Sequence, residues 1–248
     1  MKKFWQRLGL TALSLFIAII LVLLVWAANP AQPENMAFDS MGSNQEVLFD
    51  EINRWLVYQP RDANPETGLI LYPGGRVDYR AYAPLARYIA TEGFTTIIVP
   101  MPLNFAFLGI NRASDVMQTF PEIKHWAIGG HSLGGAMAAE FAKSHPSAVE
   151  GLILWAAYPG DNTDLSELDL TVVSIYASND GLATLEDIQD SRARLPEDSQ
   201  FVLIEGGNHA GFGWYGAQNG DGIAEMSKVE QQDQIVTTTI NLLTMLQE

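Results

Sequence analysis

The chain has 248 residues, 48% of them hydrophobic, which is enough for one large domain with its own core. Its 29 acidic and 14 basic residues give a formal net charge of −15, which argues against a nucleic-acid partner, because phosphate backbones are bound by basic surfaces. The sequence contains no cysteine, so disulfides and thiolate metal sites are excluded.

An uncharged segment at residues 8–28 is the first predicted element. As a helix it is about 30 Å long, which matches the hydrocarbon core of a bilayer. The apolar part of a signal peptide is shorter, about 7–15 residues, so the length favours a retained transmembrane anchor. Val25-Trp26-Ala27 also fits a signal-peptidase site, and secretion after cleavage is therefore the alternative.

Basic residues flank only one side of this segment. Lys2, Lys3 and Arg7 precede it, and the next basic residue is Arg54. The positive-inside rule therefore places residues 1–7 in the cytoplasm and the remainder of the chain outside, at the cell membrane.

The rest of the chain divides into a linker and a domain. Residues 29–44 are rich in proline, glycine, serine and asparagine, a composition typical of turns, and we expect a flexible tether there. Residues 45–248 show no second change of composition and predict a single folded domain.

Within this domain, short apolar runs alternate with helical patterns. The alternation predicts an α/β fold in which a mostly parallel sheet carries helices on both faces. We predict strands at 46–50, 54–59, 68–72, 94–99, 125–130, 150–156, 171–176 and 201–205, and helices at 80–91, 112–119, 133–145, 185–194 and 230–247. The connection between strands 150–156 and 171–176 is short, so we expect little or no cap domain over a site.

The motif Gly-His-Ser-Leu-Gly at residues 130–134 lies between a predicted strand and a helix rich in small residues. A serine on such a sharp strand-to-helix turn projects its hydroxyl away from the backbone, and the flanking glycines relieve the crowding of the turn. The amino terminus of the helix favours negative charge that develops there. Ser132 is therefore the candidate nucleophile, and an ordinary serine in a glycine-rich turn is the alternative.

A serine nucleophile needs a basic partner, and the chain offers four histidines. His125 begins a strand, His131 lies inside the motif, and His145 ends a helix, so each has a structural explanation. His209 lies in a loop directly after the last strand, at the carboxyl edge of the sheet, where sites of parallel sheets form. We predict His209 as the base.

The histidine in turn needs a carboxylate that orients it. Asp180 follows the strand at 171–176 by a few residues, and the chain order Ser132, Asp180, His209 is the order of the α/β-hydrolase triad. Asp161 is a competing acid on the same edge of the sheet, whereas Asp187 fits a solvated helix face.

Backbone N–H groups must stabilise the oxyanion that such a reaction forms. One is expected from Leu133, at the start of the helix. The second is expected from the loop after the strand at 68–72, where we predict Gly75, with its neighbour Arg76 as the alternative donor.

Other side chains are candidates for binding the substrate. Arg76 lies where it can attract a substrate carboxylate, and a solvated arginine is the alternative. Tyr158, Trp214 and Tyr215 are candidates for lining the acyl pocket, and aromatic core packing explains them equally well.

With these residues placed, residues 45–248 resemble the α/β-hydrolase superfamily, and most closely the bacterial single-domain group related to dienelactone hydrolases. The motifs are Leu-Tyr-Pro-Gly-Gly-Arg-Val-Asp at residues 71–78 and Asn-His-Ala-Gly-Phe-Gly at residues 208–213. Dienelactone hydrolases use a cysteine nucleophile, whereas this chain has Ser132, so the resemblance implies a general esterase. It also implies no metal and no organic cofactor.

The sequence therefore predicts a carboxylesterase-like serine hydrolase of small-molecule esters, attached to the membrane through residues 8–28. Two alternatives remain open. An acyltransferase would use the same residues and pass the acyl group to an alcohol or amine, and a non-catalytic binding module would use the fold without the chemistry.

Overall fold

Eight strands form one sheet in the order β1-β2-β4-β3-β5-β6-β7-β8 in the computed structural model, which describes residues 2–247. The pairs β1–β2 and β2–β4 are antiparallel, and all pairs from β4 to β8 are parallel. The strands are β1 (Val47–Ile52), β2 (Trp55–Pro60), β3 (Thr67–Tyr72), β4 (Thr95–Ile98), β5 (His125–His131), β6 (Gly151–Trp155), β7 (Thr171–Ala177) and β8 (Gln200–Ile204).

Helices cover both faces of the sheet, and alternate residues of each central strand therefore enter different cores. In β3, Leu69 and Leu71 pack with helices α3 (Ala83–Thr91) and α7 (Lys228–Met245) on one face. Ile70 and Tyr72 pack on the other face with helices α4 (Arg112–Thr119) and α5 (Leu133–Ser144). The remaining helices of the domain are α6 (Leu185–Ser191) and the short 3₁₀ helices η1 (Tyr79–Tyr82), η2 (Pro102–Asn104), η3 (Ala106–Leu108), η4 (Arg192–Arg194) and η5 (Ala210–Phe212).

Polar side chains set the starts of two helices. Thr184 and Asp187 form a capping box at α6, and Ser227 and Glu230 form another at α7, so the first N–H groups of both helices are satisfied. Each predicted strand and helix has a counterpart within a few residues of its expected position. The prediction of a mostly parallel sheet with helices on both faces is confirmed.

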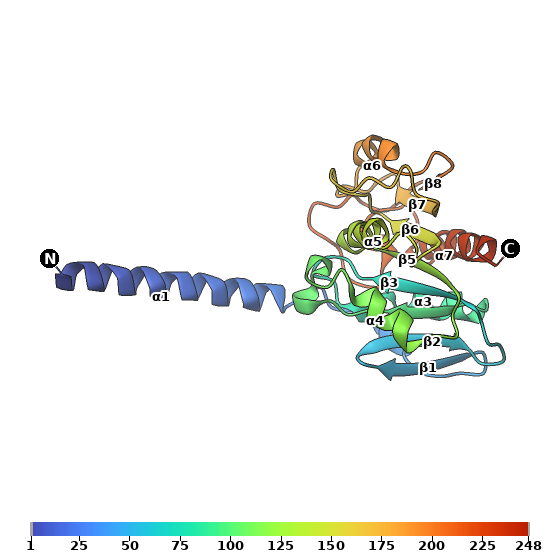
Figure 1. Cartoon of the computed structure of the whole chain (residues 1–248), viewed down its shortest axis with the longest axis horizontal. Helices are drawn as coiled ribbons and strands as arrows, with labels where there is room; N and C mark the ends of the chain where they lie inside the picture. The colour runs from blue at the N-terminus through green and yellow to red at the C-terminus, as the bar shows by residue number, and fades with distance from the viewer. Residues whose placement is uncertain (1, 248) are drawn as a thin grey trace.

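Helix α1 (Lys2–Ala27) projects away from the domain, so that the amino terminus and the carboxyl terminus lie at opposite ends of the molecule (Figure 1). Its segment Phe4–Ala27 is long and apolar enough to cross a membrane, and the most apolar part of the segment is not buried against the domain. Beyond Arg7 the helix has no charged residue and is hydrophobic on all sides, as expected for a helix surrounded by lipid.

Residues 29–44 differ from the flexible tether that their composition predicts. Ala31 forms a β-bridge with Val77, Pro33 forms one with Tyr215, and residues 35–39 form helix α2 (Asn35–Asp39). The segment therefore runs along the domain. Turn-rich composition indicates irregular backbone, but it carries no information on the long-range bridges that fix this segment.

Candidate active site

Ser132 lies on the sharp turn between β5 and α5, with φ 52° and ψ −124°. This backbone conformation is strained for a residue with a side chain, and strain of this kind is concentrated at functional sites. A Cβ atom on either Gly130 or Gly134 would overlap the carbonyl oxygen of Tyr72, so glycine is required at both positions. The small residues predicted around the serine thus allow α5 to start close to β3.

His209 and Asp180 are brought together at the carboxyl edge of the sheet by the loops after β8 and β7. The two side chains are buried, and His209 Nδ1 lies 2.8 Å from Asp180 Oδ2. The other carboxylate oxygen of Asp180 accepts hydrogen bonds from the backbone N–H groups of Leu182 and Ala183, each at 2.8 Å. These bonds fix the carboxylate, and the carboxylate in turn fixes the orientation of the imidazole.

The second nitrogen of the imidazole, His209 Nε2, is buried and has no hydrogen-bond partner within residues 2–247. A bond from Ser132 Oγ to this nitrogen is therefore not formed in the structure. Ser132 follows β5, and Asp180 and His209 follow β7 and β8, so all three leave the same edge of the sheet. Catalytic hydrogen bonds of this type frequently tighten only when substrate binds.

The competing residues have other partners. Asp161 is 96% exposed and pairs with Arg194, and Asp187 caps helix α6, so neither carboxylate contacts His209. His125 lies 2.8 Å from a carboxylate oxygen of Glu150.

His145 Nδ1 lies 3.1 Å from the carbonyl oxygen of Phe141, within the last turn of α5. Among the residues that the structure describes, no cluster of His, Asp and Glu is placed to hold a metal ion.

The loop after β3, residues 73–76, faces the start of α5. The Gly74 N–H donates to the Tyr82 hydroxyl at 3.0 Å, and the Arg76 N–H donates to the Asn104 backbone oxygen at 2.8 Å. Between them, the Gly75 N–H has no acceptor in the described part of the chain. A Cβ on Gly75 would lie 3.1 Å from the Leu133 side chain.

Leu133 is the first residue of α5, so its N–H cannot bond within the helix. The Arg76 N–H is occupied, whereas the N–H groups of Gly75 and Leu133 have no acceptor within residues 2–247 and lie at the start of α5.

Two buried side chains, Tyr82 and His131, lie next to this loop and hold it in place. The Tyr82 hydroxyl that binds Gly74 lies 2.8 Å from His131 Nδ1, and the rings of His131 and His209 are 4.4 Å apart. Burial, together with the nearby His209, lowers the pKa of His131 well below its usual value, and burial raises the pKa of Tyr82. Both side chains are therefore neutral. Hydrogen bonds connect Gly74 to Tyr82 and Tyr82 to His131, and the His131 ring packs beside the His209 ring.

Residues 68–233 match the family model described as alpha/beta hydrolase family, and they make up more than half of the chain. The chain belongs to the alpha/beta hydrolase family. The resemblance seen in the sequence is thus confirmed at the level of the family, and the closer relation to dienelactone hydrolases stays a prediction. A comparison with curated proteins found no match.

Solved structures of other hydrolases share the fold. One is a "predicted CIB-like hydrolase" from Thermoplasma acidophilum, with a TM-score of 0.56 and 16% identity, over 80% of this chain and 97% of that one. Another is an alpha-beta serine hydrolase homologue from Coxiella burnetii, with a TM-score of 0.55 and 16% identity, over 79% and 98% of the two chains. At such low identity, the similarity shows the fold alone.

Two residues that the sequence did not single out hold the loops of the candidate residues Asp180 and His209. The carboxylate of Asp221 accepts hydrogen bonds from the N–H groups of His209, Ala210 and Gly181, at 2.8–3.3 Å, and so joins the loop of His209 to the loop of Asp180. The amide of Gln231, on α7, donates to the Asn208 backbone oxygen and accepts from the Asn208 N–H. No local pattern marks either residue, because their partners are distant in the sequence.

The predicted substrate-binding residues of the hydrolase lie in different surroundings. The guanidinium of Arg76 donates to backbone oxygens at the end of α1 and just beyond it, and it stacks on Trp26. Trp214 is half-buried, and its backbone bonds to Ala81 and Glu34.

The Tyr158 hydroxyl is near Asp187, and partial burial together with that carboxylate raises the pKa of Tyr158. Tyr215 is buried, and the structure brings it to a cavity beside Gly75.

Proposed function

We propose that this chain is a serine hydrolase that cleaves carboxylic esters through an acyl-enzyme on Ser132. The observation that carries the proposal is the buried pair of His209 and Asp180, 2.8 Å apart, at the sheet edge from which the strained Ser132 also projects. A buried histidine held by a fixed carboxylate is the arrangement that activates a serine hydroxyl.

In the proposed reaction, His209 Nε2 accepts the hydroxyl proton of Ser132 while Oγ attacks the ester carbonyl carbon. The N–H groups of Gly75 and Leu133 stabilise the negative oxygen of the tetrahedral intermediate, and the amino terminus of α5 adds to the favourable field. The alcohol leaves with the proton from His209, and the acyl group stays on Ser132. Water, deprotonated by the same nitrogen, then releases the acid and restores the serine.

The surroundings of His209 suit this cycle. Asp180 stabilises the imidazolium that forms in each half-reaction. His131, whose ring is 4.4 Å away, stays neutral because burial lowers its pKa, so His209 does not gain its charge next to a second cation.

Replacement of the nucleophile tests the proposal. Turnover of p-nitrophenyl esters by Ser132→Ala should fall by about 10⁴-fold or more, because the acyl-enzyme cannot form. Ser144→Ala, at the exposed far end of the same helix, is the matched control and should retain wild-type turnover. Comparable activity of the two purified variants would overturn the proposal.

We further propose that α1 is a retained membrane anchor, with residues 1–7 in the cytoplasm and the hydrolase domain outside. Ala27, where cleavage would occur, is 6% exposed, and its carbonyl oxygen accepts a hydrogen bond from the Asn104 side chain at 2.9 Å. The domain thus binds the end of α1, which supports retention over removal as a signal peptide.

Two measurements test the anchor. Edman sequencing of the mature protein should not yield a chain that begins near Ala28. A carboxy-terminal alkaline phosphatase fusion should be active, because that enzyme requires export, whereas a fused ordinary green fluorescent protein should stay dark. The opposite pattern of reporters would refute the orientation.

A further inference from the structure

The end of α1 is fixed beside the proposed oxyanion loop. Arg76, the neighbour of Gly75, donates from its guanidinium to the carbonyl oxygens of Trp26 and Asn29, at 3.2 and 2.9 Å. The guanidinium carbon of Arg76 also lies 4.0 Å from the centre of the Trp26 ring. The position of the site relative to the membrane span is therefore determined by direct contacts.

An apolar loop, residues 102–108, continues from this contact. The exposed fractions of Leu103, Phe107 and Leu108 are 41%, 51% and 48%. Leu103 and Asn104 both have positive φ, 50° and 59°, which is unusual for residues other than glycine. Bonds of Asn104 to Arg76 and Ala27 hold this strained backbone against the end of α1, and apolar side chains are exposed on it.

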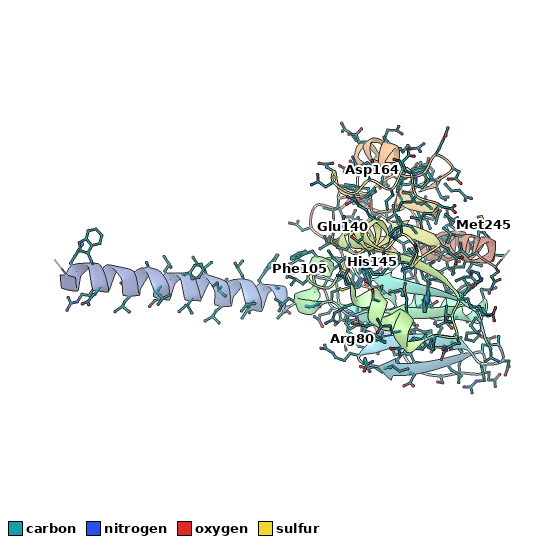
Figure 2. The ribbon with its side chains drawn as sticks, viewed as in Figure 1. Arg80, Phe105, Glu140, His145, Asp164 and Met245 are labelled. Atoms are coloured by element: carbon teal, nitrogen blue, oxygen red, sulfur yellow. The ribbon has the colours of Figure 1, made fainter. Side chains whose placement is uncertain are left out.

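Aromatic rings connect this apolar loop to the end of the span. The Phe105 ring lies 5.9 Å from the Trp26 ring and 5.2 Å from the Phe107 ring. Phe105 lies at the end of the domain that α1 joins, whereas Met245 lies at the opposite end (Figure 2). Tryptophan, as at position 26, is enriched at the depth of lipid headgroups, and phenylalanine favours the apolar interior of the bilayer.

The charge pattern favours a lipid surface over a water-exposed one. The chain has 29 acidic residues, yet none lies between Gly93 and Ser114, and the first acidic residue of the chain is Glu34. The apolar loop and the end of α1 therefore form a neutral to basic region on an acidic protein. Charged side chains are costly to bring into a bilayer, so the absence of carboxylates suits contact of this region with lipid.

A cavity of about 440 Å³ opens beside this region. It is lined by residues 29–31, which follow α1, by Gly75, and by Tyr215 and Gln218 from the segment after His209. Asn29 is separated from Ala27 by at most about 7 Å of chain. The headgroup layer extends about 5–8 Å beyond the hydrocarbon core on each side, so one wall of the cavity lies at headgroup depth.

We propose that residues 102–108 insert into the bilayer that α1 spans, and that the site takes an amphiphilic ester whose acyl chain is dissolved in this bilayer. The inference rests on the proposed hydrolase and its anchor. The ester group enters the cavity beside Gly75 at headgroup depth, and the acyl chain stays among the lipids until the acid is released.

The test uses full-length protein in phosphatidylcholine vesicles and two substrates. One is p-nitrophenyl acetate, which is soluble in water, and the other is a fluorogenic oleoyl ester dissolved in the bilayer. The loop variant is Phe107→Gln with Leu108→Gln, and the control is Val229→Gln with Met245→Gln, two exposed apolar residues of α7. For the loop variant, kcat/KM on the bilayer ester should fall by at least about tenfold, and kcat/KM on the acetate should not change. The reason is that the site lies against the bilayer in a smaller fraction of the variant molecules.

Each outcome has a defined meaning. Equal rates of the loop and control variants on the bilayer ester, or equal losses of the loop variant on both esters, would overturn the inference. A wild type that hydrolyses the acetate but not the bilayer ester would overturn it and leave the proposed function intact. A wild type inert toward both esters would overturn both.

A second measurement does not depend on activity. The chain has no cysteine, so Phe107→Cys and Met245→Cys each provide a single site for an environment-sensitive fluorophore. Spin-labelled phosphatidylcholine should quench the fluorophore at 107 several-fold more than the one at 245. Equal quenching at the two positions would show that the loop does not touch the bilayer.

Discussion

Tyr82→Phe removes one buried hydroxyl next to the proposed oxyanion loop. The hydroxyl is the only partner found within residues 2–247 for the Gly74 N–H and for His131 Nδ1, at 3.0 and 2.8 Å, and Tyr82 is 2% exposed. Its removal leaves both buried groups unpaired, at a cost of about 1–3 kcal/mol each. We therefore expect the free energy of unfolding to fall by about 2–6 kcal/mol.

The same change should also impair catalysis, because Gly74 positions the N–H of Gly75. We expect kcat on a soluble ester to fall by about tenfold or more with little change in KM, since the oxyanion is formed only during the reaction. Urea unfolding followed by tryptophan fluorescence gives the stability, and initial rates give kcat.

Tyr58→Phe is the matched control for this variant. Tyr58 is fully buried, and its hydroxyl has no hydrogen-bond partner in the described chain, so its loss should be neutral or slightly stabilising. If Tyr82→Phe is as stable and as active as Tyr58→Phe, the network from Gly74 to His131 does not support the site.

Two further predictions concern residues beside the nucleophile. Asp180→Asn should lower kcat by about 10³–10⁴-fold, because His209 loses the carboxylate that orients it, whereas Asp161→Asn should be harmless; the reverse ranking in ester assays would refute the assignment. Burial holds the pKa of His131 below its usual value of 6.5, so unfolding at a pH below 6.5 takes up a proton. The free energy of unfolding should therefore fall as the pH decreases, by at most about 1.4 kcal/mol per pH unit. Urea unfolding at pH 7.5 and 5.5 should show that the free energy of unfolding decreases less for His131→Gln than for the wild type. Equal decreases for the two proteins would show that burial does not lower the pKa of His131.

The parts of the fold that the sequence predicted depend on local patterns. The strands β3, β5 and β6 are buried on both faces and are therefore apolar along their length, so each can be predicted from its own residues alone. The sequence makes Ser132 a candidate nucleophile because its turn requires glycine at positions 130 and 134. Asp180 and His209 are candidates because each follows a strand of a parallel sheet, and the structure brings the two side chains together.

The parts that the sequence did not predict depend on contacts between distant segments. Asp221 binds N–H groups 11 to 40 positions away, and nothing in its own turn indicates this role. Arg76 was a candidate for the substrate, but its guanidinium binds the end of α1, which lies 47 to 50 positions earlier in the chain. Such pairings follow from tertiary packing, which residue type and spacing do not encode.

The proposed function requires that His209 activates Ser132 as a nucleophile. A fluorophosphonate probe followed by peptide mass spectrometry tests it most directly, because the probe forms a stable adduct only with an activated serine. We predict one adduct, on the peptide that contains Ser132, which is absent in Ser132→Ala and strongly slowed in His209→Gln. An adduct on another serine, or equal labelling of the wild type and His209→Gln, would show that His209 does not activate Ser132.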